Sequence, residues 1–397
     1  MRGMTRALLT TPSPSPTSPT PASRARHGSR PLGLLQLLQK AVATYGPSSA
    51  RGRALAASLG GLALAIALSV SPGRAEAQGT GRAGNNPPAA TPGLPQGERI
   101  DVGGFKLNSV HVPRPKGADL PPLVFIHGAS TSLLDPYGAF RVPLDGRAEM
   151  LFVDRPGLGF SDAGGPRNRF PDGQADAIAT LMQKRGIRRA IIVSHSFGGA
   201  IAATFALRHK EMVAGLVFLS PATHPWPGGI EWYYSVAKSP VIGPLFTALV
   251  VPPVGLLSID KATRAVFAPN PRPDDYVEKT RARLALRPGA FRNNATDIAN
   301  LLGYVREVAP RYREITAPTV IITGDRDGVV LPEIHSVGLH KAISGSRLIR
   351  IHNLGHKPDY VVTDVAIAAI ETVAGRHPDL DGIARRAERR IAKDDAK

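Results

Sequence analysis

The sequence of 397 residues contains no cysteine. Disulfide bonds, thiol nucleophiles and zinc sites built from cysteine are therefore excluded. The sequence also lacks a phosphate-binding loop, a dinucleotide-binding glycine fingerprint and an H-E-x-x-H metal motif. We therefore expect neither a cofactor nor a metal.

Acidic residues are scarce near the N-terminus. Residues 1–97 contain ten Lys and Arg and a single acid, Glu76, which gives this segment a net charge of +9. Residues 98–375 carry +7 and residues 376–397 carry +2, so half of the total of +18 lies in the first segment. The central part has no basic stripe with interleaved aromatic residues, and we expect no binding to nucleic acid.

The N-terminal segment has the pattern of a membrane-targeting sequence. Arg51 and Arg53 precede a charge-free stretch over residues 54–73, and residues 75–77 have the A-x-A form of a signal-peptidase site. Twenty charge-free residues are also just long enough to span a bilayer. We expect an exported or cell-envelope protein, either periplasmic or secreted after cleavage, or anchored through 54–73. Membrane contact is expected only through this segment, and an Ala-rich leader with no membrane role is the alternative.

After a Gly/Pro-rich linker over 78–97, the folded part is expected to start at Glu98. Short apolar runs alternate with stretches of helical spacing, which predicts βαβ units. The fold class is therefore α/β: a mostly parallel twisted sheet with helices on both faces. A hairpin is expected over 99–113, and the last residues, 376–397, are read as a charged tail. Strands are expected over 123–127, 149–154, 190–193, 215–219, 319–323 and 347–351, and helices over 172–185, 197–209 and 358–373.

One segment breaks this alternation. Residues 222–313 contain no convincing strand and are rich in aromatic residues. The pattern predicts a helical cap inserted into a core made of 98–221 and 314–375, placed over the carboxyl ends of the strands, where chemistry gathers in such sheets. A helical decoration packed away from the site is the alternative.

A serine follows the strand predicted over 190–193 and precedes a helical segment. In the run over 191–200, I-I-V-S-H-S-F-G-G-A, small residues stand two before and two after Ser196. Such a strand-to-helix turn exposes the hydroxyl and places the next backbone N–H at a helix N-terminus. Ser194 takes the place of the first glycine of the usual G-x-S-x-G pattern.

Three further motifs accompany this turn, each just after a predicted strand. They are F-I-H-G-A over 125–129, D-R-P-G-L-G-F-S-D over 154–162, and the pair G-D-R-D over 324–327 with G-H over 355–356. In this order they resemble the α/β-hydrolase fold family, over roughly residues 98–375.

The resemblance implies a catalytic triad. Ser196 would be the nucleophile, His356 the base, and Asp327 the acid that orients the imidazole. Asp325 competes with Asp327 for the last role, although the motif spacing favours Asp327. Among the other histidines, His195 would point away from Ser196, His127 belongs to the loop after the first strand of the core, and His352 is expected to pack.

The resemblance also implies an oxyanion hole formed by the backbone N–H groups of Ala129 and Phe197. The side chain of Ser130 would either add a donor or cap a turn. Arg155 and Asp162 are expected to brace their loop without taking part in the chemistry.

The function implied is that of a serine hydrolase. It would cleave a carboxylic ester of a small to medium apolar substrate through an acyl-enzyme intermediate, with a small-molecule ester as its partner. Two alternatives remain open: a cofactor-free perhydrolase or carbon–carbon bond hydrolase with the same triad, and a non-catalytic ligand-binding protein of the same fold.

Overall fold

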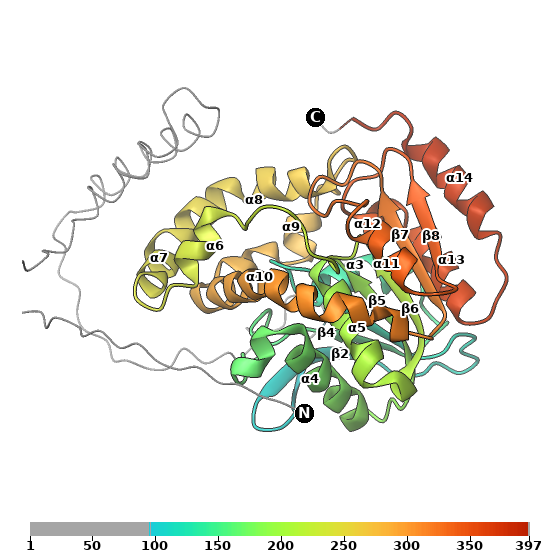
Figure 1. Cartoon of the computed structure of the whole chain (residues 1–397), viewed down its shortest axis with the longest axis horizontal. Helices are drawn as coiled ribbons and strands as arrows, with labels where there is room; N and C mark the ends of the chain where they lie inside the picture. Colours follow the sequence, from blue (N-terminus) through green and yellow to red (C-terminus); the bar gives the residue numbers. More distant parts are fainter. Residues whose placement is uncertain (1–94, 96, 396–397) are drawn as a thin grey trace, which may run out of the picture. The chain divides into compact units, whose positions relative to one another are not determined.

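The computed structural model describes residue 95 and residues 97–395 (Figure 1). The segment predicted as a signal sequence or anchor, 54–73, lies outside the described residues. In the described part, no single helix is both long enough and apolar enough to cross a bilayer.

Eight strands form one sheet in the order β1-β2-β4-β3-β5-β6-β7-β8. All pairs from β4 to β8 are parallel, whereas β1 pairs with β2 and β2 with β4 in antiparallel fashion. The predicted fold class, a mostly parallel sheet, is confirmed. The strands are β1 (Glu98–Asp101), β2 (Lys106–Val112), β3 (Leu123–Ile126), β4 (Met150–Val153), β5 (Ala190–His195), β6 (Val213–Leu219), β7 (Thr319–Gly324) and β8 (Arg347–Ile351).

Helices cover both faces of the sheet because the inner strands are apolar on both sides. Val124 and Ile126 of β3 pack into one core cluster, with residues of α4, α5 and α11. Leu123 and Phe125 pack into the other, with residues of α3, α13 and α14 (Figure 1). These helices are α3 (Leu134–Phe140), α4 (Pro171–Lys184), α5 (Phe197–Arg208), α11 (Ser336–Ala342), α13 (Thr363–Val373) and α14 (Leu380–Ile391), with short 3-10 turns η1 (Pro166–Arg169) and η2 (Lys210–Met212).

Two segments differ from the sequence predictions near the C-terminus. The single helix expected over 358–373 is two, α12 (Pro358–Val361) and α13, which are separated at Val362. The segment 376–397, expected as a charged tail, contains α14, which buries Leu380 and Ile391 against α13 and β8. Its charged residues lie on the exposed face. Because they dominate the composition of the segment, the apolar stripe that packs on the core was not recognised in the sequence.

Residues 222–313 form helices, and none of the eight strands lies there. The helices α6, α7, α8 and α10 pack on one another at the end of the molecule away from α13 and α14 (Figure 1). Their bounds are α6 (Trp232–Ala237), α7 (Gly243–Leu249), α8 (Val251–Phe267), α9 (Tyr276–Lys279), η3 (Ala282–Leu286) and α10 (Pro288–Val308), and η4 (Ala309–Glu314) returns the chain to the core.

Candidate active site

Ser196 lies in the turn between β5 and α5, where its backbone has φ 52° and ψ −121°. A non-glycine residue rarely adopts a positive φ, and such strain costs about 1–3 kcal/mol. The turn is held by two hydrogen bonds: Ser196 N–H donates to the carbonyl of Leu219 at 3.0 Å, and Ala222 N–H donates to the carbonyl of Ser196 at 2.9 Å. The strained conformation is thus fixed from the neighbouring strand, β6.

Glycine is required two residues after Ser196. A Cβ on Gly198 would lie 2.5 Å from the carbonyl oxygen of Ile126, at the end of β3. This close approach brings α5 against the loop after β3. The position two residues before Ser196 tolerates serine: Ser194 is buried, and its hydroxyl has no hydrogen-bond partner within the described residues.

His356 and Asp327 form a buried pair at the carboxyl ends of β8 and β7. His356 Nδ1 lies 2.8 Å from Asp327 Oδ2, and both residues are 3% exposed. Asp327 Oδ1 accepts the N–H groups of Val329 and Val330, each at 2.9 Å. Burial alone would raise the pKa of Asp327, but His356 and these N–H groups outweigh it and hold that pKa below its usual value. The carboxylate is therefore ionised and fixes His356 with Nδ1 protonated, which directs Nε2 to act as the base.

Among the described residues, no hydrogen bond joins Ser196 Oγ to His356 Nε2. Catalytic hydrogen bonds in substrate-free enzymes are often long and shorten when substrate binds. The structure thus joins two of the three predicted triad residues directly and places the third at the end of β5, which β6 separates from β7.

Asp325 has a different partner. Its carboxylate lies 2.7 Å from His352 Nδ1 and accepts the N–H of Asn353 at 2.8 Å. Asp325 therefore supports the loop after β8. The prediction that His352 packs is wrong: its side chain is 75% exposed, because the ion pair with Asp325 holds it at the surface.

Ala129 and Phe197 lie on the loop after β3 and at the start of α5. Within the described residues, neither backbone N–H has a hydrogen-bond partner. The neighbouring residue, Ser130, has φ 56°, and its N–H donates to Asn294 Oδ1 at 2.9 Å. Asn294 Nδ2 donates in turn to Ser130 Oγ at 2.9 Å. A residue of the helical segment thus holds the loop that contains Ala129.

Comparisons with known proteins agree with the fold. A family model described as the alpha/beta hydrolase fold matches residues 121–358, more than half of the chain. The chain belongs to the alpha/beta hydrolase family.

The relatives include hydrolases. The chain is 28% identical over 243 residues to a 2-(acetamidomethylene)succinate hydrolase from Mesorhizobium japonicum, which covers 58% of this chain and 78% of the relative. It is 27% identical over 227 residues to a 2-hydroxy-6-oxo-6-phenylhexa-2,4-dienoate hydrolase from Comamonas testosteroni, which covers 54% and 72%. A solved esterase structure from Thermogutta terrifontis has a TM-score of 0.52 and 20% identity and covers 73% of this chain and 100% of its own, which supports the fold alone.

In this alpha/beta hydrolase, Arg155 connects the helical segment to the loop after β3. It is fully buried, donates to the carbonyl of Gly128 at 2.9 Å and to Asp297 Oδ2 on α10 at 2.7 Å, and lies 4.0 Å from the ring centroid of Phe197. Burial raises the pKa of Asp297 to about 6, although Arg155 opposes this shift. His127 accepts the N–H of Arg155 at Nε2, at 3.1 Å. Arg155 therefore braces both expected oxyanion-hole segments, not only its own loop.

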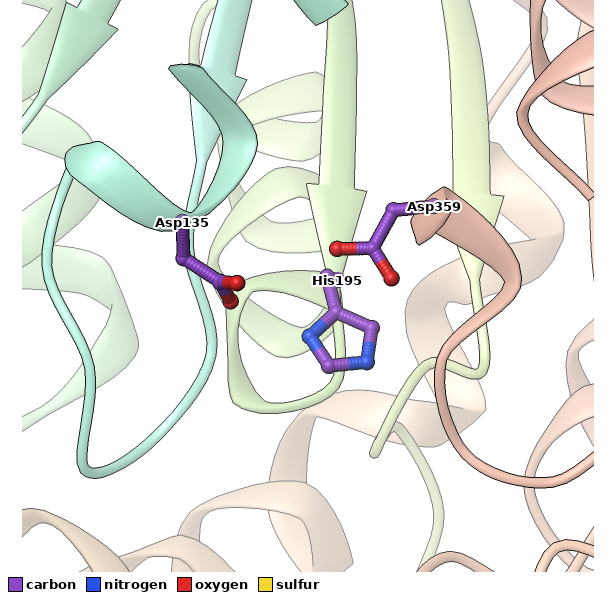
Figure 2. Close-up of side chains that lie close together, drawn as sticks. All are labelled: Asp135, His195 and Asp359. Atoms are coloured by element: carbon purple, nitrogen blue, oxygen red, sulfur yellow. The ribbon is translucent and has the colours of Figure 1, made fainter. Parts of the chain in front are cut away.

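A second buried cluster lies beside His356. Figure 2 shows the ring of His195, at the end of β5, between the carboxylates of Asp135 on α3 and Asp359 on α12. Their ligand atoms lie within 4.8 Å of one another, the spacing of a metal site. However, the ammonium of Lys357 lies 2.8 Å and 3.0 Å from the oxygens of Asp135 and 2.9 Å from Asp359 Oδ2, and it supplies the positive charge there.

This cluster holds the backbone of the loop that contains His356. His195 Nε2 lies 2.8 Å from the carbonyl oxygen of His356, so Nε2 carries the proton and donates it. Burial, and then the charge of Lys357, hold the pKa of His195 well below its usual value. Sequence reasoning missed this role, as it missed Asp135, Lys357 and Asp359. The only available signal was a lysine directly after the predicted catalytic histidine.

Proposed function

We propose that the protein is a serine hydrolase that cleaves a carboxylic ester of a small to medium apolar substrate. The buried His356–Asp327 pair, at the same sheet edge as Ser196 in its strained turn, is the observation that carries this proposal. Membership of the alpha/beta hydrolase family supports it at the coarser level of a hydrolase.

The reaction would proceed in two halves. Ser196 Oγ attacks the ester carbonyl carbon while its proton passes to His356 Nε2, and the imidazolium is stabilised by Asp327. The N–H groups of Ala129 and Phe197 donate to the oxyanion of the tetrahedral intermediate. The carbon–oxygen bond to the alcohol then breaks, and His356 returns the proton to the leaving oxygen. Water, deprotonated by His356, attacks the acyl-enzyme, and the acid is released as Ser196 regains its proton.

A fluorophosphonate probe tests the nucleophile. The wild-type protein should be labelled with one phosphonyl group, and Ser196→Ala should not be labelled. Ser194→Ala is the matched control, because it removes a hydroxyl from the same turn that has no partner within the described residues. Equal labelling of Ser196→Ala and the wild type would refute the assignment.

A series of p-nitrophenyl esters of rising acyl length tests the substrate class. A burst of p-nitrophenol equal to the enzyme concentration is expected before the steady state, because the acyl-enzyme accumulates. Labelling by the probe without cleavage of any ester would instead favour a carbon–carbon bond hydrolase or perhydrolase with the same triad. The similarity to the dienoate hydrolase from Comamonas testosteroni favours the first of these alternatives.

We also propose that the protein is exported, with the N-terminal segment as its signal or anchor. N-terminal sequencing of the protein isolated from its own cells should start at Gln78 after cleavage. An intact N-terminus in the membrane fraction would indicate the anchored form.

A further inference from the structure

Exposed apolar side chains are concentrated on one part of the helical segment. Twelve large apolar side chains are exposed in the described part of the chain, and eight of them lie between residues 232 and 257. We call these eight the cap apolar surface. They are Trp232 (51% exposed), Val241 (83%), Ile242 (51%), Leu245 (63%), Leu249 (65%), Val254 (49%), Leu256 (52%) and Leu257 (89%).

Helical spacing aligns these side chains. Ile242, Leu245 and Leu249 are separated by three and four residues along α7, and Val254 and Leu257 by three along α8, so each set lies on one stripe. The two helices pack together and meet at a bend of 61° (Figure 1). Both helices therefore present apolar side chains to solvent, one set on each side of the bend.

The charge pattern of this segment fits a lipid bilayer. Residues 239–259 contain no charged residue. The exposed Lys238 precedes them, and after them Asp260, which is paired with Arg264 and Arg272, stands before the exposed Lys261. Neither lysine forms an ion pair in the described part of the chain. An uncharged apolar stretch between cations is the pattern of a segment that places its apolar side chains among acyl chains and its cations among anionic headgroups.

The hydropathy of the helix pair also fits contact with a lipid bilayer. Together α7 and α8 reach the length and hydropathy of a membrane span, although neither does so alone. A buried core helix would also reach this hydropathy, but the side chains of the cap apolar surface are half or more exposed. The sharp bend favours a pair that lies along the interface rather than across the bilayer.

A protein partner fits this surface less well. Protein interfaces form about one hydrogen bond per 100–200 Å² and are enriched in Tyr, Trp and Arg. Seven of the eight side chains here are aliphatic. The hydroxyls of Thr247 and Ser258 donate within their own helices, to the carbonyls of Gly243 and Val254. The surface therefore offers hardly any directional contact to a second protein.

We propose that the cap apolar surface docks onto an anionic lipid bilayer and inserts into its interfacial region. The sequence predicts membrane contact only through residues 54–73, so this is a second contact, made by the folded domain. It places α7 and α8 of the predicted cap at the membrane. It rests on exposure and charge and is independent of the proposed esterase activity.

Trp232 provides a reporter within the surface. The chain has two tryptophans, and Trp226 packs against the core, with its ring 5.8 Å from that of His335. In full-length Trp226→Phe protein, fluorescence therefore reports on Trp232. With vesicles of phosphatidylcholine and phosphatidylglycerol at three to one, its emission should shift to the blue and be quenched by brominated acyl chains. Binding through the N-terminal segment alone would leave Trp232 in water and unquenched.

Two matched substitutions complete the test. Leu257→Glu places a charge in the surface, and Val142→Glu makes a similar change at a side chain that is 80% exposed elsewhere. Leu257→Glu should weaken the partitioning of the protein into vesicles, measured by the quenching of Trp232, at least tenfold. Val142→Glu should weaken it less than twofold. Equal effects of the two substitutions, or no quenching in the parent protein, would overturn the proposal. Protection of Trp232 from acrylamide that rises with protein concentration without vesicles, and is lost in Leu257→Glu, would also overturn it, because the occupant is then a second copy.

Discussion

Replacement of Lys357 by methionine should strongly destabilise this hydrolase. The ammonium is 1% exposed and forms three contacts of 2.8–3.0 Å with the carboxylates of Asp135 and Asp359, each also 1% exposed. It also lies 5.1–5.9 Å from the ring centroids of Phe267, Tyr276 and Tyr360. Methionine has a similar length and would fill the space, so the loss comes mainly from charge and hydrogen bonding.

The magnitude follows from what the substitution leaves behind. Two carboxylates that share one ammonium would remain buried with no positive partner in contact. Removal of one member of a buried ion pair costs about 3–5 kcal/mol, because the remaining charge is desolvated without compensation. Tyr276 still donates to Asp135 Oδ1 at 2.9 Å, which limits the loss. We therefore expect a decrease of about 3–4 kcal/mol in the free energy of unfolding.

Urea unfolding, followed by circular dichroism, measures this change. Lys341→Met is the control, since Lys341 is exposed on α11 and its loss should change the free energy by less than about 0.5 kcal/mol. In the double variant Lys357→Met/Asp135→Asn, one of the two uncompensated charges is removed. Part of the lost stability should return, and the coupling energy of the double-mutant cycle measures the pair directly.

The same substitution should lower kcat more than it raises KM. Lys357 follows His356 in the chain, so movement of its backbone displaces the imidazole that we propose as the base, whereas Lys357 itself is buried away from solvent. A loss of less than about 1 kcal/mol for Lys357→Met would refute the reasoning, because the two carboxylates would then not depend on the ammonium.

Three further predictions concern single contacts. Asp327→Asn should lower kcat by about 10⁴-fold, because Nδ1 of the catalytic histidine loses its acceptor, whereas Asp325→Asn should change steady-state kcat by less than tenfold. Asn294→Ala should cost about 0.5–1.5 kcal/mol in thermal unfolding, since the partly buried N–H of Ser130 loses its acceptor. Burial lowers the pKa of His335 to about 4, where Nδ1 accepts two backbone N–H groups. Neutral His335 therefore contributes about 3 kcal/mol above pH 6.5, which is lost as the pH falls to about 4, and His335→Asn should weaken this dependence in unfolding measured from pH 7 to 4.

The sheet could be predicted from the sequence because its strands are buried on both faces. Leu123–Ile126 and Met150–Val153 are continuous apolar runs, and every residue in them is buried. In such runs composition alone distinguishes strand from loop, and the alternation with helices then determines the parallel order. Ser196, Asp327 and His356 could be proposed because they follow β5, β7 and β8, and parallel strands carry their following loops to the same edge.

The buried cluster around Lys357 could not be predicted in this way. Asp135 and Lys357 are 222 residues apart in the chain, and a single Asp or Lys in an apolar segment is normally read as exposed. No periodicity marks such a pair, because it depends on how α3 and α12 meet above the sheet. The amphipathic helix α14 was missed for a related reason, since its many charged residues suggested a solvated tail.

The sequence predicts a division of the chain into a core and a cap, but hydrogen bonds link the two parts. Asn294 and Asp297 lie one turn apart on α10, inside the predicted cap, yet they hold Ser130 and Arg155 of the core. Arg155 in turn donates to the carbonyl of Gly128, so the loop that contains Ala129 has supports on both sides of the boundary. If the cap moved as a rigid lid, these hydrogen bonds would break and the oxyanion loop would lose its support. A rearrangement of α6–α8 over a fixed α10 would instead keep these hydrogen bonds and leave the loop in place.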